Sequence, residues 1–328
     1  MRFLRTSLPG VDSLLQAARD NAAYLLKIKR SLSLKKIMSP AVEAQILIFH
    51  FSKINRIDFL TGTKIPSLPQ KKKIEQALQK RLTGIPAAYL TETAGFYGHD
   101  FLVNPSVLIP RPETELLVEQ TLKILNQVPQ GSDPSGTKAA KSLFSPRGQR
   151  GQTPLAPEVL EIGTGSGCIA VSLTIARPDC RMTALDISSE ALKTARRNAR
   201  QHGVAGRISF VKSDLFSVFG PRHRGRWDIL VSNPPYVPRS DFRNLQREVK
   251  KEPRLALDGG KSGLVVIEKI LREAPYYLKN GGYILLEIGK GQSRALGKMA
   301  TQMKFFQSLK FVKDYAGIDR FLVARKIG

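Results

Sequence analysis

The chain contains the glycine-rich stretch Glu161-Ile162-Gly163-Thr164-Gly165-Ser166-Gly167. It includes the end of a short apolar run, 159–162, that predicts a buried strand, and it leads into a predicted helix. Glycines here let the backbone approach a ligand closely, and free amides at a helix start favour an anionic group. A dinucleotide fingerprint would have its third glycine at position 168, which is Cys168. The spacing therefore disfavours NAD or FAD.

The chain around this stretch has the pattern of a doubly wound α/β sheet. After Pro157, short apolar runs alternate with amphipathic stretches. We predict strands at 159–162, 181–185, 207–211, 228–232, 282–288, 310–314 and 321–325. The last two are separated by Tyr315-Ala316-Gly317, which leaves no room for a crossover helix, so they should pair antiparallel. Parallel strands that end in such a hairpin resemble the seven-stranded, Rossmann-like sheet of class I methyltransferases.

A length of 328 residues exceeds one typical domain, and we expect a small and a large one. From Leu14 to about Leu82 the apolar side chains recur at helical spacing, which predicts a helical N-terminal domain over residues 1–94. Residues 95–108 carry aromatic and β-branched residues with turn formers, and predict a β-hairpin that joins this domain to the sheet domain, 109–328. Residues 129–157 concentrate Pro, Gly, Ser and Gln, which predicts a disordered insertion.

The net charge of +25 concerns partners rather than fold, because so much positive charge repels itself unless an anionic partner is near. RNA, DNA or proximity to the ribosome would suit it. The alternative is a basic, merely solvated surface, since basic residues are spread over both halves of the chain.

Several classes of protein are disfavoured. The two cysteines, Cys168 and Cys180, are too far apart for a metal knuckle or a redox pair, and the four histidines lack ligand spacing, so we expect no metal. No stretch approaches the ~18 apolar residues of a membrane helix, and no signal peptide begins the chain. We therefore expect a cytoplasmic protein without membrane contact. The basic first 38 residues could form an organelle transit peptide, but Asp12, Asp20 and the helical pattern favour folded structure.

Acidic residues follow two further strands. Asp186 ends the second strand 23 residues after Gly163, where a carboxylate can accept from both hydroxyls of a ribose; the alternative is a cap for the next helix. After the third strand, Asp214 could accept from an adenine amino group while Leu215 packs on the ring. The alternative is an ordinary turn, because Asp and Ser are both common turn residues.

Asn233-Pro234-Pro235-Tyr236 directly follows the fourth strand, at the edge where open α/β sheets hold ligands. Its Asn233 side-chain oxygen and Pro234 carbonyl can each accept one N–H of a planar amide-type nitrogen, and so orient it toward a methyl donor. Tyr236 would stack on that planar group. The alternative is a rigid turn, because Asn-Pro and Pro-Pro both mark loops.

These motifs resemble the PrmC/HemK family, the glutamine methyltransferases of peptide chain release factors. The likeness spans most of the chain and includes Leu108-Ile109-Pro110-Arg111-Pro112-Glu113-Thr114-Glu115 and Glu252-Pro253-Arg254-Leu255-Ala256-Leu257-Asp258-Gly259-Gly260. The resemblance implies methylation of the side-chain amide, N(5), of the glutamine in the Gly-Gly-Gln motif of class 1 release factors, with S-adenosyl-L-methionine as cofactor.

The resemblance also implies roles for individual residues. It implies cofactor contacts at Gly163, Thr164, Gly165, Ser166, Gly167, Asp186, Leu215 and Asn233, while Asp214 is a cofactor candidate only from its position after the third strand. The substrate site consists of Asn233, Pro234, Pro235 and Tyr236, of which Asn233, Pro234 and Tyr236 are the expected catalytic residues. The helical domain would dock the release factor. For Arg111 and Glu113, a salt-bridged structural clamp is an equal alternative to substrate contact.

Two other functions stay open at this point. An adenine-N6-type DNA or RNA methyltransferase also acts on a planar conjugated nitrogen, and the basic charge favours it. A basic binding protein that only retains the scaffold is the second, although the intact glycines, Asp186 and Asn233 disfavour it. The chain departs from the family pattern at Lys251, where an aromatic residue is expected, and at Leu215, where a larger ring usually lies beside the adenine.

Overall fold

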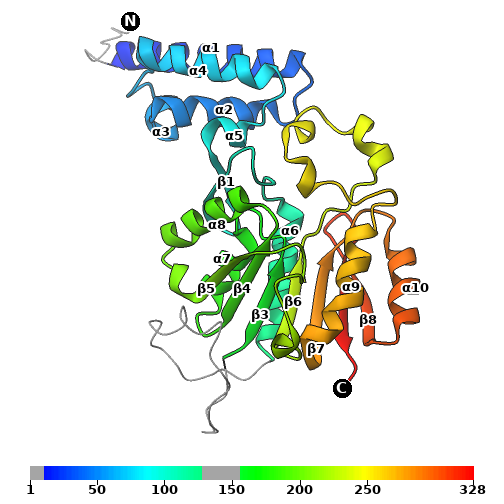
Figure 1. Ribbon diagram of the computed structural model, residues 1–328. Helices are drawn as coiled ribbons and strands as arrows, with labels where there is room; N and C mark the ends of the chain where they lie inside the picture. Colours follow the sequence, from blue (N-terminus) through cyan, green and yellow to red (C-terminus); the bar gives the residue numbers. More distant parts are fainter. Residues whose placement is uncertain (1–10, 128–155) are drawn as a thin grey trace, which may run out of the picture. The chain divides into compact units, whose positions relative to one another are not determined.

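The computed structural model describes residues 11–127 and 156–328 (Figure 1). The chain forms two compact units, one of Met1–Glu92 with Arg247–Lys251 and one of Thr93–Gln246 with Glu252–Gly328. The hairpin predicted as a linker belongs to the larger unit, and the short segment Arg247–Lys251 belongs to the smaller one, which the sequence did not indicate. The predicted insertion, except for its last two residues, lies outside the described part of the chain.

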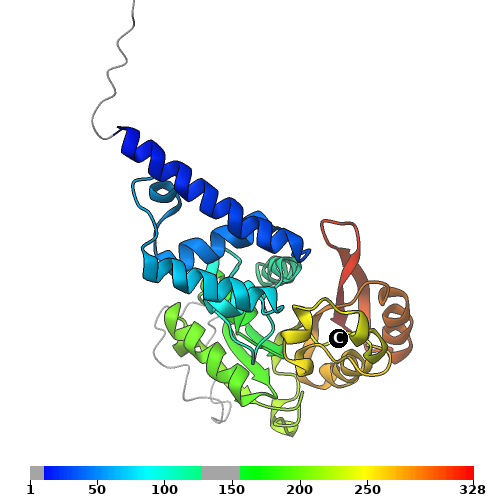
Figure 2. The ribbon, with the colours of Figure 1, turned by 90° about the horizontal axis from the view of Figure 1, so that it is seen from above.

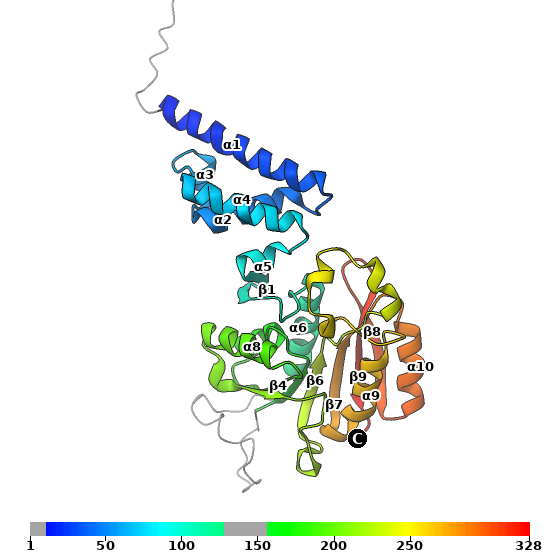
Figure 3. The same cartoon turned by 45° about the horizontal axis from the view of Figure 1, so that its top comes forward.

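The smaller unit is helical, as predicted. It contains α1 (Val11–Leu34), α2 (Pro40–Ser52), α3 (Arg56–Leu60), α4 (Leu68–Leu82) and α5 (Ala87–Thr91). Pro40 occupies the first turn of α2, where its missing N–H costs nothing, and the Gln70 side chain accepts from the Ser67 amide to cap the start of α4. Helices α1, α2 and α4 lie side by side (Figures 2 and 3) and enclose a core that includes Ile28, Leu47, Phe59 and Ile74.

The larger unit contains all seven predicted strands in one sheet. They are β3 (Glu158–Ile162), β4 (Arg181–Asp186), β5 (Ile208–Lys212), β6 (Trp227–Ser232), β7 (Leu278–Glu287), β8 (Phe306–Lys313) and β9 (Asp319–Lys326), in the order β5-β4-β3-β6-β7-β9-β8. Strands β3 to β7 are parallel, and β9 pairs antiparallel with both β7 and β8. This is the predicted class I methyltransferase sheet.

The predicted hairpin is a separate two-stranded sheet of β1 (Thr93–Phe96) and β2 (His99–Leu102). It is attached to the larger unit by Asn198, whose side chain accepts from the Leu102 amide at 2.7 Å and donates to the Leu102 carbonyl at 3.0 Å. A buried side chain therefore satisfies the backbone at the free end of the hairpin.

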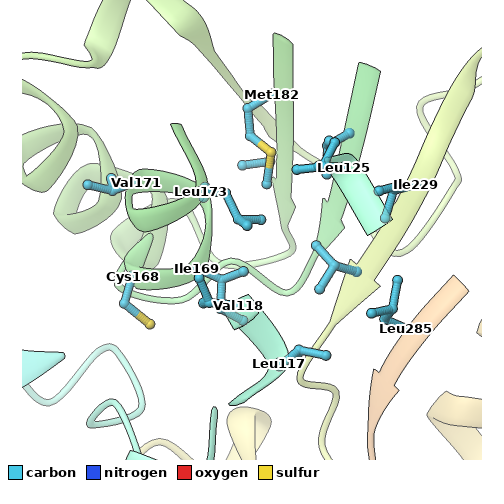
Figure 4. Close-up of a cluster of buried hydrophobic side chains, with 14 of the residues drawn as sticks. Leu117, Val118, Leu125, Cys168, Ile169, Val171, Leu173, Met182, Ile229 and Leu285 are labelled. Carbon is cyan, nitrogen blue, oxygen red and sulfur yellow. The ribbon is translucent and has the colours of Figure 1, made fainter. Parts of the chain in front are cut away.

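Helices cover both faces of the large sheet. They are α6 (Pro112–Leu125), α7 (Cys168–Ala176), α8 (Ser189–Gln201), α9 (Val265–Tyr277) and α10 (Ser293–Met303). The larger unit also contains 3-10 turns at Ala205–Arg207, Pro221–His223, Arg239–Asn244 and Arg254–Ala256, whereas the turn Val249–Lys251 belongs to the smaller unit. Leu117 and Val118 of α6 and Ile169 of α7 pack on one face of the sheet, toward Ile229 and Leu285 (Figure 4). Helices α9 and α10 pack on the other face. Alternate residues of each central strand are therefore buried on opposite faces.

Candidate active site

A cavity of about 360 Å³ opens at the carboxyl ends of the central strands in the larger unit. Its wall contains residues from the loops after four strands: Gly163, Thr164, Gly165 and Ser166 after β3, Asp186 at the end of β4, Asp214 and Leu215 after β5, and Asn233, Pro234 and Pro235 after β6. Parallel strands bring their carboxyl ends to one edge, so residues up to about 70 positions apart converge there. The size suits a drug-sized small molecule. Of the residues expected in the site, Gly167 and Tyr236 are absent from the wall.

The glycine loop combines close backbone turns with open space. Gly163, Gly165 and Gly167 all have positive φ values, of 73°, 56° and 81°. No atom lies within 4 Å of the position that a Cβ would take at Gly163 or Gly165, so a ligand can come close there. At Gly167 a Cβ would lie 3.0 Å from the Cβ of Ala195 in α8. Gly167 therefore permits close packing of α7 against α8, and it does not line the cavity.

The Asp186 carboxylate accepts hydrogen bonds from both the glycine loop and the start of α8. Its Oδ2 accepts from the Gly165 amide at 2.8 Å, and its Oδ1 accepts from the Ser188 amide at 2.8 Å. Burial raises the pKa of Asp186, against the lowering effect of these bonds. The cap of α8 is Ser188, whose hydroxyl accepts from the Ala191 amide. Because a carboxylate has about four acceptor positions, Asp186 can hold the loop and still accept from ligand hydroxyls.

Asp214 and Leu215 both line the cavity, as expected. Leu215 has φ of 47°, an unfavourable value for a residue with a Cβ, and the Ser213 hydroxyl donates to the Leu215 carbonyl at 2.7 Å. Its side chain also packs against the core on the α9 face. The turn is thus fixed by the surrounding structure, and it presents an apolar side chain to the cavity.

Glu161 is a site residue to which the sequence assigned no role. It lies in β3, is almost completely buried and lines the cavity. Its Oε2 accepts from the Thr164 hydroxyl at 2.7 Å, whereas its Oε1 has no hydrogen-bond partner. Burial raises the pKa of Glu161 to about 8. A buried acceptor without a partner is costly, and it suits a ligand that brings a positive or donor group.

Asn233 lines the cavity and is hydrogen-bonded to Thr114 of α6, which also lines it. Its Nδ2 donates to the Thr114 hydroxyl at 3.1 Å, and Thr114 donates to Glu287 Oε2 at 2.7 Å. The Tyr236 hydroxyl reaches Oε1 of the same carboxylate at 3.3 Å. The Tyr236 ring packs against the core, and burial raises the pKa of its hydroxyl. In the structure Tyr236 therefore packs behind the loop and does not line the cavity.

The two flanking motifs also meet within the larger unit. Glu252 accepts from the Ile109 amide at 3.0 Å and forms an ion pair with Arg111. Arg111 thus takes part in a clamp, the structural alternative considered for it, and also lines the cavity. The second motif follows the Asn-Pro-Pro-Tyr loop closely: a Cβ at Gly259 would lie 2.8 Å from the carbonyl carbon of Tyr236, so only glycine fits there.

Residues 11–127 and 156–328 contain neither a cluster suited to a metal ion nor a membrane-spanning helix. In these ranges no group of three or more His, Cys, Asp or Glu side chains is placed to hold a metal ion. Cys168 and Cys180 are both buried and unbridged, and burial raises the pKa of each thiol to about 12. No helix in the described part of the chain is long and apolar enough to cross a bilayer.

Comparisons with known proteins identify relatives along most of the chain. The family profile described as "PrmC N-terminal domain" matches residues 23–91, and the profile "Methyltransferase small domain" matches residues 149–265. Three relatives named "Release factor glutamine methyltransferase" align along most of the chain. The protein from Chlorobaculum tepidum is 37% identical over 88% of this chain and 91% of its own length. Those from Nitratidesulfovibrio vulgaris and Neisseria gonorrhoeae are each 35% identical, over 91% and 87% of this chain and 92% and 93% of their own lengths. The chain therefore belongs to the release factor glutamine methyltransferase family.

Proposed function

We propose that this chain methylates the side-chain amide nitrogen, N(5), of the glutamine in the Gly-Gly-Gln motif of class 1 release factors. The observation that carries the proposal is the position of Asn233, which lines the cavity while its Nδ2 is bonded to the hydroxyl of Thr114 in the same wall. The carboxamide is planar, so its oxygen is directed away from Thr114 and can accept an N–H. The names of the relatives support the same substrate.

The residues of the cavity fit S-adenosyl-L-methionine, which supplies a methyl group on a positively charged sulfur. The unpartnered Oε1 of Glu161 is a natural acceptor for the ammonium group of the cofactor. Asp186 would accept from the ribose hydroxyls, with Asp214 and Leu215 beside the adenine. Gly163 and Gly165 leave the open space that close approach needs.

An amide nitrogen is a weak nucleophile because its lone pair is delocalised into the carbonyl. The Asn233 oxygen and the Pro234 carbonyl would each accept one N–H and aim the nitrogen at the methyl carbon. Once bound, the cofactor would supply the methyl group to this nitrogen, and the electron pair of the broken carbon–sulfur bond would go to sulfur. The nitrogen would lose one proton to water. Tyr236 supports this loop from behind, through its contact with Glu287.

We assign docking of the release factor to the helical unit, which the N-terminal domain profile covers. Leu14, Leu15 and Leu26 of α1 expose about half of their surface or more, which suits contact with a protein. Ribosome or RNA proximity and a cytoplasmic location are further parts of the proposal, and the net charge of +25 supports the first of them.

The test is methylation by the purified protein with isotope-labelled cofactor. We expect label on a class 1 release factor, and mass spectrometry should find one added methyl group on the Gly-Gly-Gln peptide. A release factor with this glutamine changed to glutamate is the matched control and should stay unlabelled. Label on DNA or RNA instead would replace this proposal with an adenine-N6 activity.

A further inference from the structure

A chain of hydrogen bonds runs from the candidate substrate site into the protein interior. Asn233 Nδ2 is 3.1 Å from Thr114 Oγ1, which is 2.7 Å from Glu287 Oε2, and Tyr236 closes the chain at Glu287 Oε1. The three supporting residues come from α6, the end of β7 and the loop after β6. Thr114 and Glu287 expose only 2% and 1% of their surface. The contacts are therefore shielded from exchange with water.

The bonds in this chain have one direction. An ionised carboxylate only accepts, so Thr114 gives its single hydroxyl proton to Glu287. The Thr114 oxygen is then available only as an acceptor, and it must face a donor. Of the two ends of the Asn233 carboxamide, only the NH₂ end can donate. Glu287 thus determines, through Thr114, which way the carboxamide is turned.

The orientation matters for the reaction. With Nδ2 toward Thr114, the Asn233 oxygen is presented to the incoming N–H; with the carboxamide reversed, two N–H donors would face each other. We propose that Thr114 and Glu287 are positioning residues that hold the Asn233 carboxamide with its oxygen toward the methyl-accepting nitrogen. This inference rests on the proposed function, and it adds two residues that act through Asn233: Thr114, which lines the cavity beside it, and Glu287, which does not line the cavity.

The charge on Glu287 decides which groups donate and which accept in this series of hydrogen bonds. Burial raises the pKa of Glu287 to about 7, while the bonds from Thr114 and Tyr236 and the charge of Arg320 lower it, and Glu113 raises it further. Arg111 is the other charged side chain that acts on Tyr236 at this end. When Glu287 is protonated it can donate to Thr114, and the orientation of Asn233 is no longer fixed. Turnover should therefore fall as the pH drops through about 7.

The first experiment removes the Thr114 hydroxyl. Thr114→Val should lower kcat by about 10- to 100-fold, the effect of losing one oriented polar group, with KM and cofactor affinity within about threefold of wild type. Thr114→Ser keeps the hydroxyl and should restore most of the turnover. Thr121→Val is the matched control: Thr121 lies on the same helix and is fully buried, but its hydroxyl donates to the Leu117 carbonyl at 2.7 Å. It should leave kcat within about twofold of wild type.

A double-mutant cycle shows whether Thr114 acts through Asn233. In an Asn233→Ala background, Thr114→Val should cost no further turnover, because the group that it positions is gone. Losses that multiply, or a Thr114→Val enzyme as active as Thr121→Val, would overturn the inference. If Thr114→Val does not fold, Glu287→Gln decides the matter: it should abolish the inflection of turnover near pH 7, and an unchanged pH profile refutes the inference.

A readout without activity separates this inference from the proposed function. In the cofactor-free protein, the side-chain NH₂ signal of Asn233 is identified by its loss in Asn233→Ala. Its hydrogen exchange should become faster in Thr114→Val and stay unchanged in Thr121→Val. Unchanged exchange in both variants refutes the positioning role of Thr114, even if wild type methylates the release factor. Faster exchange in Thr114→Val alone, with no methylation by wild type, supports the positioning role and refutes the proposed substrate.

Discussion

Replacing Glu161 by glutamine tests the cofactor site most directly. The carboxyl is buried, its Oε1 has no partner, and burial raises its pKa to about 8. At pH 7 the free protein should therefore hold about 0.9 proton on Glu161. An ammonium group beside Oε1 stabilises the ionised carboxylate, so cofactor binding should expel most of this proton. Glu161→Gln keeps the size and the bond from Thr164 but has no proton to release.

Titration calorimetry in two buffers of different ionisation enthalpy measures the released protons. We expect about 0.9 proton per cofactor for wild type at pH 7, and none for Glu161→Gln. The variant should bind about 10- to 100-fold more weakly, as expected for loss of a charge-assisted hydrogen bond. Glu158→Gln is the matched control, because Glu158 lies in the same strand but pairs with Arg226 and does not line the cavity. Zero proton release by wild type, or equal affinities of Glu161→Gln and wild type, would refute the reasoning.

The same carboxyl should affect stability in the absence of cofactor. Its pKa is raised from 4.5 to about 8 in the folded protein, so the folded state binds this proton more tightly than the unfolded state. The favourable contribution is complete below pH 4.5 and is lost as the pH rises to about 8. Urea unfolding at pH 5 and pH 8 should show this decline in wild type and a smaller one in Glu161→Gln.

Three further substitutions test other parts of the structure. Asn233→Ala should keep cofactor affinity within about tenfold but lower turnover by about 10²–10³, and unchanged turnover removes Asn233 from the mechanism. Arg81→Met should destabilise the helical unit by about 3 kcal/mol in urea unfolding, because it leaves Glu43 and Glu248 without their buried partner; a loss under about 1 kcal/mol contradicts this account. Gly167→Ala should cost about 1–3 kcal/mol through its positive φ and the contact with α8, and an equally stable variant would show that α8 moves aside.

The strands were predictable because their core positions alternate or run continuously between turn signals. The ends of the strands were less predictable. Strand β7 begins at Leu278, although Lys279, Asn280 and two glycines follow it and indicate a turn. The strand continues because Leu278 pairs with Trp227 across a register shift, and Gly281 takes a φ of 73°. Such an irregularity depends on the neighbouring strand, and no local pattern reports it.

The candidate site also contains residues that the sequence could predict and residues that it could not. Loops that follow parallel strands could be assigned from topology alone, and this placed Gly163, Asp186 and Asn233 correctly at the cavity. The supporting residues could not be assigned, since their contacts join distant parts of the chain. Thr114 is 119 residues from Asn233 and 173 from Glu287. For Glu161 and Glu287 the sequence did contain a signal. Each is a glutamate inside an apolar strand, at a buried position where an apolar residue would be the default.

The topology of the sheet explains the positions of two buried carboxyls, Glu161 and Glu287, and why their functions can be tested separately. Strand β6 lies between β3 and β7, with Ser232 paired to Ile162 on one side and Leu286 on the other. Asn233 therefore leaves the sheet between Glu161 and Glu287, which both face the side covered by α6 and α7. Buried carboxyls without an ion pair reduce stability, so the presence of both at this one edge of the sheet indicates function. Because one lines the cavity and the other bonds Thr114, loss of Glu161 should weaken cofactor binding, whereas loss of Glu287 should lower turnover and leave that binding intact.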